Sequence, residues 1–172
     1  MKLFICEICG DAYIGEEKPA DCPFCGAPNN YIKDGKEAQS IVLKDLTLDE
    51  KSRGNLEKTY DLEVRAAAIY TCMAGKAKTY EVKAMFKRLA KIELEHAVIT
   101  TKILKKEAPK TVEEICSDED LENFQKTVEL ENHATSLYEE FAKTSENVDI
   151  RILFTALAQA EKGHLELMKN FL

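Results

Sequence analysis

Apolar residues recur at alternating spacings of three and four in four long segments of the chain, which is the pattern of amphipathic helices. The pattern begins close to Asp49, whose side chain can cap a helix N-terminus. We expect helices at about 49–75, 78–105, 118–144 and 148–171. The residues before this region show no sustained helical period, so the chain divides into two parts with different local structure.

The connections between the predicted helices have unequal lengths. Gly75 marks a short turn between the first two helices, and residues 144–147 mark another between the last two. The connection in the middle is longer and contains Pro109. Two short turns on either side of one long crossover are typical of ferritin-like bundles. The sequence therefore predicts a mainly α protein with a ferritin-like four-helix bundle.

Ionisable residues interrupt each apolar stripe near its middle. The first and third stripes each contain one glutamate, and the second and fourth each contain a Glu-x-x-His pair: Glu63, Glu131, Glu93/His96 and Glu161/His164. The spacing of each pair puts both side chains on one helix face. Four buried carboxylates at one level destabilise a protein unless positive charge compensates them, and two divalent cations would supply that charge. The pattern predicts a dinuclear metal site with imidazoles completing the ligand shells.

The two halves of the predicted bundle repeat the same spacing. The glutamates of the first and second helices are 30 residues apart, and so are those of the third and fourth. Tyr70 follows Glu63 by seven residues, and Tyr138 follows Glu131 by seven. Helical side chains lean toward the N-terminus, so each tyrosine can donate a hydrogen bond to a ligand carboxylate. We expect a pseudo-twofold site in which Tyr70 and Tyr138 support the ligands.

Other ionisable residues lie near these positions. Glu129 competes with Glu131 for the place on the third helix, but the helical neighbours of Glu129 are polar, which favours Glu131. His133 lies on the same polar face and is interpreted as a surface histidine. Glu95 adjoins His96 but points in another direction, so we expect it to face solvent.

The N-terminal region contains a different candidate site. Cys6 and Cys9 form one Cys-x2-Cys turn, and Cys22 and Cys25 form a second. Paired turns of this kind place four thiolates tetrahedrally around one metal, and both zinc and iron accept that geometry. A module this small needs a structural metal to fold. We expect a four-cysteine metal domain at residues 1–35 and the bundle at residues 36–172.

Composition excludes some classes of function. The 172-residue chain has a net charge of −7 and no basic stripe, which argues against nucleic-acid binding. It lacks an apolar run long enough for a membrane span or a secretory signal, so we expect a cytoplasmic protein without membrane association. In a reducing compartment, isolated cysteines are usually free thiols. We therefore expect Cys72 and Cys116 to be unpaired.

The residues around the cysteines resemble a rubredoxin knuckle, namely Cys9-Gly10, Tyr13 and Cys22-Pro23-Phe24-Cys25-Gly26. With the bundle pattern, nearly the whole chain resembles the rubrerythrin family, in the reverse order with the knuckle first. The resemblance implies one iron bound by the four cysteines. It also implies a di-iron site with the ligands Glu63, Glu93, His96, Glu131, Glu161 and His164.

The resemblance also implies an activity. Members of the family are peroxidases that reduce hydrogen peroxide to water, with electrons from NAD(P)H passed through a rubredoxin reductase or rubredoxin. This chain departs from well-known members on the third helix. They carry an extra carboxylate three residues beyond the ligand glutamate, where this chain has Ala134, or Asn132 if Glu129 is the ligand. The resemblance therefore does not extend to the redox-linked movement of iron.

Alternative functions follow from the same residues. A ferroxidase or O2-reducing oxidase uses a similar ligand set, and a zinc knuckle on an iron-handling protein is a non-enzymatic alternative. A linker at about 35–47 joins the two parts, and a dimer would allow electron transfer from the knuckle of one chain to the bundle of another. We therefore expect a homodimer.

Overall fold

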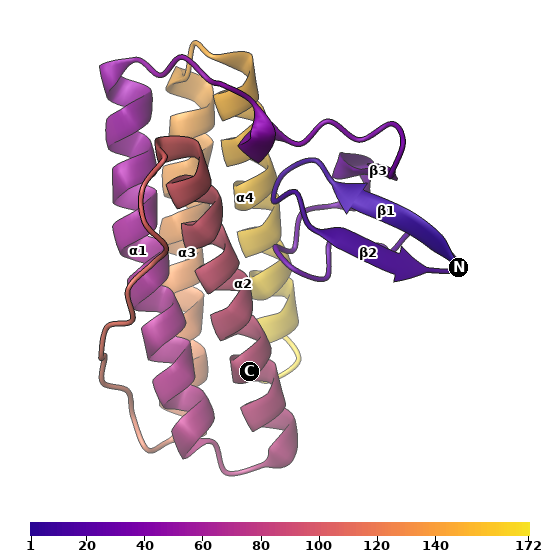
Figure 1. Ribbon diagram of the computed structural model, residues 1–172. Coiled ribbons are helices and arrows are strands. Elements are labelled where there is room, and N and C mark those ends of the chain that lie inside the picture. The colour runs from indigo at the N-terminus through magenta and orange to yellow at the C-terminus, as the bar shows by residue number, and fades with distance from the viewer.

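Four long helices form a bundle in the computed structural model, which describes residues 1–172 (Figure 1). The helices are α1 (Glu50–Lys76), α2 (Tyr80–Leu104), α3 (Asp120–Thr144) and α4 (Val148–Met168). Their ends lie within three residues of the predicted ones, and the predicted bundle with its long crossover is confirmed. None of the helices is long and apolar enough to span a membrane.

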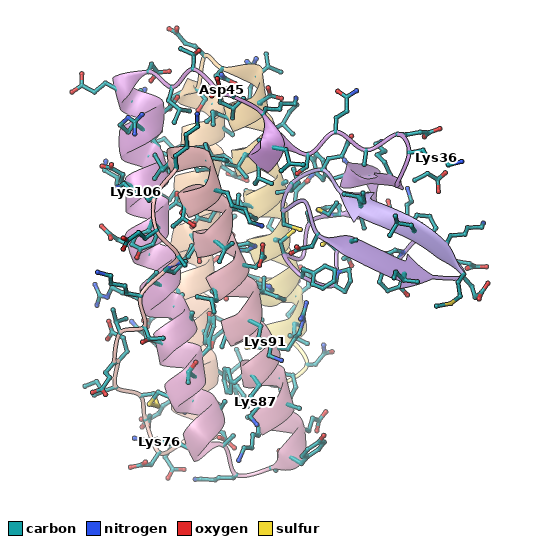
Figure 2. The ribbon with its side chains drawn as sticks, in the orientation of Figure 1. Lys36, Asp45, Lys76, Lys87, Lys91 and Lys106 are labelled. Atoms are coloured by element: carbon teal, nitrogen blue, oxygen red, sulfur yellow. A yellow bond between two sulfur atoms is a disulfide. The ribbon has the colours of Figure 1, made fainter.

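Polar side chains cap three of the four helices at the N-terminus. The carboxylate of Asp49 accepts a hydrogen bond from the Ser52 amide at 2.7 Å, as the sequence predicts for α1. Thr79 and Asn147 cap α2 and α4 in the same way. Charged side chains such as Lys87 and Lys91 lie on the outer surface of α2 (Figure 2). The apolar stripes therefore face inward, toward the level of the glutamates.

The N-terminal residues form a small antiparallel sheet beside the bundle. Its strands are β1 (Lys2–Cys6), β2 (Ala12–Gly15) and β3 (Ile32–Asp34), in the order β2-β1-β3. Two short 3-10 helices lie in the same region: η1 (Asn29–Tyr31) precedes β3, and η2 (Ile41–Leu43) follows it. The sheet and its cysteine loops lie against the side of the bundle near α2 and α4 (Figure 1).

The knuckle and the bundle share one hydrophobic core. Ile8 and Ala27 of the knuckle belong to the same buried cluster as Ile99 of α2 and Leu157 of α4. Gly26 has a φ of +71°, and a Cβ added there would lie 3.3 Å from the Cβ of Ala160 on α4. Glycine therefore provides the left-handed turn and also allows the loop to approach the helix closely.

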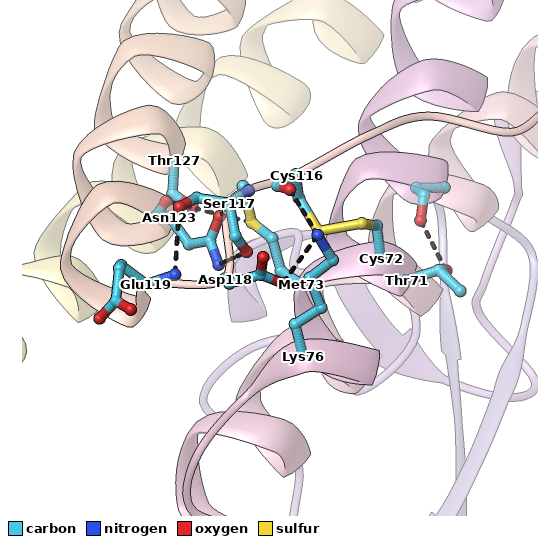
Figure 3. Close-up of a disulfide and its surroundings, with 11 residues drawn as sticks. Thr71, Cys72, Met73, Lys76, Cys116, Ser117, Asp118, Glu119, Asn123 and Thr127 are labelled. Carbon is cyan, nitrogen blue, oxygen red and sulfur yellow. Dashed lines mark hydrogen bonds and ion pairs between the residues drawn. A yellow bond between two sulfur atoms is a disulfide. The ribbon is translucent and has the colours of Figure 1, made fainter.

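A disulfide joins Cys72 of α1 to Cys116 of the crossover, with Cα atoms 5.9 Å apart (Figure 3). The prediction that these two cysteines are free thiols is wrong. They are separated by 44 residues, and only the path of the crossover along α1 brings them together. Lys76 reinforces the attachment, because its ammonium donates to the Cys116 carbonyl at 2.8 Å. The crossover is thus fixed to α1 just before α3 begins.

Removing the disulfide will lower the stability of the protein. In a Cys72→Ser/Cys116→Ser variant we expect the free energy of unfolding to fall by about 2–4 kcal/mol, because the unfolded chain regains the freedom of a large loop. Denaturant titration followed by circular dichroism measures the difference. Wild-type protein treated with a reductant should match the variant, and the reductant should leave the variant unchanged. Equal stability of oxidised and reduced wild type would contradict the prediction.

Candidate metal centres

The six candidate ligands of the bundle meet at one level in its interior. Each helix contributes: Glu63 from α1, Glu93 and His96 from α2, Glu131 from α3, and Glu161 and His164 from α4. All six side chains are buried. Because the apolar stripe continues above and below this level, the helices that bury the stripe also bury the ionisable groups.

Two of the glutamates are shared between two overlapping groups. His96 Nδ1 lies 3.1 Å from a Glu93 oxygen and 3.2 Å from a Glu161 oxygen. His164 Nδ1 lies 3.3 Å from Glu93 and 3.0 Å from Glu161. Each histidine also approaches a glutamate that belongs to its own group alone. Nδ1 of His96 lies 3.5 Å from Glu63, and Nδ1 of His164 lies 3.3 Å from Glu131. Glu93 and Glu161 would therefore be bridging ligands of two cations, and the remaining glutamate and histidine of each group would be terminal ligands.

The donor atoms of this cluster fit a pair of cations. Both carboxylate oxygens of Glu93 and of Glu161 are buried without a hydrogen-bond partner, and so is Nδ1 of His96. Buried polar atoms without partners are strongly destabilising. Two divalent cations between the carboxylates would satisfy these atoms and offset the negative charge. The four carboxylate oxygens of Glu93 and Glu161 are the atoms that would bridge the cations, and Nδ1 of His96 is the atom that would bind one of them.

Burial and mutual repulsion alter the protonation of the cluster in the metal-free state. Burial and, to a smaller extent, the negative charge of the nearby Glu93 together raise the pKa of Glu63 to about 8. Burial also raises the pKa of Glu131. Burial alone would lower the pKa of His96, but Glu161 and the other carboxylates raise it well above its usual value. The metal-free site therefore holds protons at neutral pH, and cations must displace them.

The predicted tyrosine hydrogen bonds are present, and they cross between α1 and α3. The hydroxyl of Tyr70 on α1 donates to Glu131, and the hydroxyl of Tyr138 on α3 donates to Glu63. Each ring stacks on a phenylalanine, with centroids 6.0 Å apart for Phe86 and 5.9 Å apart for Phe154. Burial raises the pKa of each tyrosine, so both remain donors.

Sequence reasoning missed the role of these phenylalanines. Each lies seven residues before a bridging glutamate, Phe86 before Glu93 and Phe154 before Glu161. This spacing repeats in both hairpins, as the tyrosine spacing does. The repeated spacing could have predicted that Phe86 and Phe154 pack against the rings of Tyr70 and Tyr138.

The structure places the neighbouring ionisable residues in different environments. Glu129 is exposed and pairs with Lys126 at 3.0 Å, so Glu131 is the glutamate of α3 that joins the cluster. His133 is exposed, as expected. The prediction that Glu95 faces solvent is wrong. Its side chain is 19% exposed and forms a group with Cys9 and Asp11 of the knuckle, because the knuckle covers this face of α2.

The four cysteines of the knuckle converge on one point. The sulfurs of Cys6 and Cys25 are 3.8 Å apart, and those of Cys9 and Cys22 are 3.7 Å apart. Four sulfurs at about 2.3 Å from a central ion form a tetrahedron with edges of about 3.8 Å. All four thiols are buried, and none forms a disulfide. Their positions therefore fit a single tetrahedral metal ion.

One hydrogen bond connects the two centres within a single chain. Nε2 of His96 lies 2.8 Å from the carbonyl oxygen of Cys25. If Nε2 donates this hydrogen bond, Nδ1 is left as the metal-binding atom, and Nδ1 is the nitrogen that faces the carboxylates. The sequence contains no signal for this contact, because it depends on how the knuckle docks on α2.

A cavity of about 350 Å³ reaches the carboxylate cluster from the side of the bundle. It lies between α1 and α3, and its lining includes Glu63, Glu131 and Tyr70. The two helices contact each other much less than the helices within each hairpin do. A small molecule therefore has a route from the surface to the cluster.

Two family models match the chain. The model described as rubrerythrin matches residues 54–172, and the model described as the rubredoxin-like domain of rubrerythrin matches residues 4–33. Reverse rubrerythrin-1 of Clostridium acetobutylicum is 33% identical over 106 residues, which cover 56% of this chain and 59% of the relative. The chain thus spans less than two thirds of that relative's length. No solved structure matches the chain.

Metal binding will depend on pH in a defined direction. In the metal-free protein the pKa of Glu63 is about 8, and the surrounding carboxylates raise the pKa values of His96 and His164 well above their usual range. These groups therefore hold protons at pH 7 that a metal ion must displace. Loading with Fe²⁺ at pH 7 under anaerobic conditions should release protons, and the apparent affinity should fall as the pH decreases. Calorimetry in buffers of different ionisation enthalpy counts the protons released. Proton release of zero at pH 7 would contradict the prediction.

A pair of variants separates the two glutamates of α3. Glu131→Gln should reduce the metal content of the bundle by about one ion per chain, because it removes a buried anionic oxygen from one of the two groups. Glu129→Gln is the matched control and should retain full metal content, since Glu129 is exposed. Elemental analysis after anaerobic loading and desalting measures both. Equal metal content in the two variants would mean that Glu131 is not a ligand.

Proposed function

The chain belongs to the rubrerythrin family, and we propose that it is a non-haem iron peroxidase that reduces hydrogen peroxide to water. The contact between Cys25 and His96 carries the proposal, because it links a one-electron type of site to a dinuclear type of site in one chain. We propose iron at both: one ion at the four cysteines, and two at the carboxylates and histidines of the bundle.

Reduction of hydrogen peroxide breaks the O–O bond and consumes two electrons and two protons to give two water molecules. When bound, two ferrous ions would supply these two electrons, and the iron at the cysteines would restore them one at a time. A cavity that ends at the carboxylates gives the peroxide access. The reaction therefore needs a two-electron site beside a one-electron carrier. The carboxylate and histidine cluster and the four-cysteine cluster support this assignment.

The chain's own residues orient this chemistry. Tyr70 and Tyr138 hold the terminal glutamates through hydrogen bonds from the opposite helix. His96 joins the two centres through its two ring nitrogens, one toward the carboxylates and one toward Cys25. The shared hydrophobic core keeps that contact in place. The path from the cysteines to the cluster is thus short and lies inside the protein.

We propose that electrons enter at the knuckle from an NAD(P)H-dependent rubredoxin reductase or from rubredoxin. A homodimer stays a prediction. Electron transfer does not require it, since a hydrogen bond between His96 and the Cys25 carbonyl already connects the two centres within one chain. An O2-reducing oxidase or ferroxidase is the second candidate. Ala134 favours it, because the cluster has a symmetric set of six ligands without an additional carboxylate on α3.

Rapid mixing of the fully reduced protein distinguishes the two activities. We expect hydrogen peroxide to oxidise the protein about tenfold faster than dissolved O2 at equal concentration, a difference of about 1.4 kcal/mol in activation free energy. The two electrons of the metal pair would reduce hydrogen peroxide completely to water, whereas complete reduction of O2 to water takes four. Stopped-flow absorbance of the two ferric centres follows the reaction. Faster oxidation by O2 would support the oxidase and reject the peroxidase.

Colour and metal content test the identity of the knuckle metal. Ferric iron bound by four thiolates absorbs strongly in the visible range, whereas zinc in the same site is colourless. We expect the isolated protein to be coloured and to lose the colour on reduction by one electron. A colourless protein with one zinc ion per chain would remove the proposed entry point for electrons.

A further inference from the structure

The cavity between α1 and α3 is larger than hydrogen peroxide requires. A water molecule occupies about 30 Å³ in the liquid, and hydrogen peroxide contains only two oxygen atoms. The volume of about 350 Å³ therefore has room for a much larger molecule, and it falls in the range of pockets that bind organic ligands. Access for hydrogen peroxide alone therefore does not explain the size of the cavity.

The apolar part of the cavity wall follows the pseudo-twofold repeat. Leu62 and Leu130 directly precede the terminal glutamates of α1 and α3, and both line the cavity. Ala66 and Ala134 follow the same glutamates by three residues and line it as well. The alanines leave space that larger side chains would fill. A symmetric pair of small residues and a symmetric pair of leucines thus form an apolar chamber.

The polar groups of the lining fall into a buried set and an exposed set. The buried set consists of the carboxylates of the cluster and Tyr70. In the exposed set, Asp61, Arg65 and His133 are open to solvent. Arg65 is drawn toward the crossover by Glu114, whose carboxylate lies 2.7 Å from its Nε. A ligand that fits this distribution has a reactive polar head, which reaches the cluster, and an apolar body, which packs between the leucines and alanines.

We propose that this cavity binds organic hydroperoxides with an apolar alkyl or aralkyl group and that the protein reduces them. The proposal rests on the proposed peroxidase function and extends its substrate class. With the metal pair bound and reduced, it would supply two electrons to the hydroperoxide ROOH, and the electrons would come from the same donors as for hydrogen peroxide. The O–O bond breaks, each oxygen takes up a proton, and the products are the alcohol ROH and water.

Kinetics with two substrates tests the proposal. Wild-type holoprotein should reduce cumene hydroperoxide as well as hydrogen peroxide. In Ala134→Leu the ratio of kcat/KM for cumene hydroperoxide to that for hydrogen peroxide should fall by about tenfold or more, a typical effect of added side-chain bulk in an apolar pocket. Ala66→Leu, on the opposite wall, should act in the same direction. Ala68→Leu is the matched control, because Ala68 faces the other groove of α1, beside the crossover, and its ratio should equal that of wild type.

Binding of the product provides a readout that does not depend on turnover. Calorimetric titration of the holoprotein with 2-phenyl-2-propanol, the alcohol from cumene hydroperoxide, should show binding to wild type and Ala68→Leu, and loss of binding in Ala134→Leu and Ala66→Leu. The outcomes separate the two proposals. A protein that binds the alcohol but reduces neither peroxide contradicts the peroxidase function alone. A protein that reduces hydrogen peroxide but neither binds the alcohol nor reduces cumene hydroperoxide overturns the inference, as do equal ratios in all four proteins.

Discussion

The structure depends on the compensation of charge among four buried glutamates and two buried histidines. The glutamates stand at one level of an otherwise apolar bundle, and several of their oxygens have no hydrogen-bond partner in the protein. Without cations, burial raises the pKa of Glu63 and the carboxylates raise the pKa values of the two histidines, so the group retains protons. Metal binding therefore acts on folding and on function through the same side chains.

The docking of the knuckle on α2 and α4 holds the four-cysteine site next to the carboxylate cluster. A four-thiolate site on a flexible tether would need to find the bundle by diffusion. Here Gly26 allows the cysteine loop to contact α4, and His96 extends from the cluster to the Cys25 carbonyl. The histidine thus belongs to both centres. The pseudo-twofold symmetry of the bundle ends at this point, because His164 has no equivalent contact with the knuckle among the hydrogen bonds of the structure.

Much of this arrangement is visible in the sequence, and the reason is that its signals are local. Helix periodicity, paired Cys-x2-Cys turns and a glutamate inside an apolar stripe are all readable within a few turns of chain. The choice of Glu131 over Glu129 as the cluster residue of α3 could be made from the sequence, because the helical neighbours of Glu129 are polar. The disulfide between Cys72 and Cys116, the burial of Glu95 and the His96 contact could not be predicted, because each depends on where the crossover or the knuckle lies in space.

The shared core of the knuckle and the bundle has a consequence for the rate at which charge moves between the centres. Ile8 and Ala27 pack in the same cluster as Ile99 and Leu157, so the separation of the two centres is set by side-chain packing and is insensitive to the length of the linker. Tunnelling through such a fixed contact needs no conformational search. For the proposed peroxidase, electron transfer between the centres would therefore not depend on movement of the knuckle relative to the bundle.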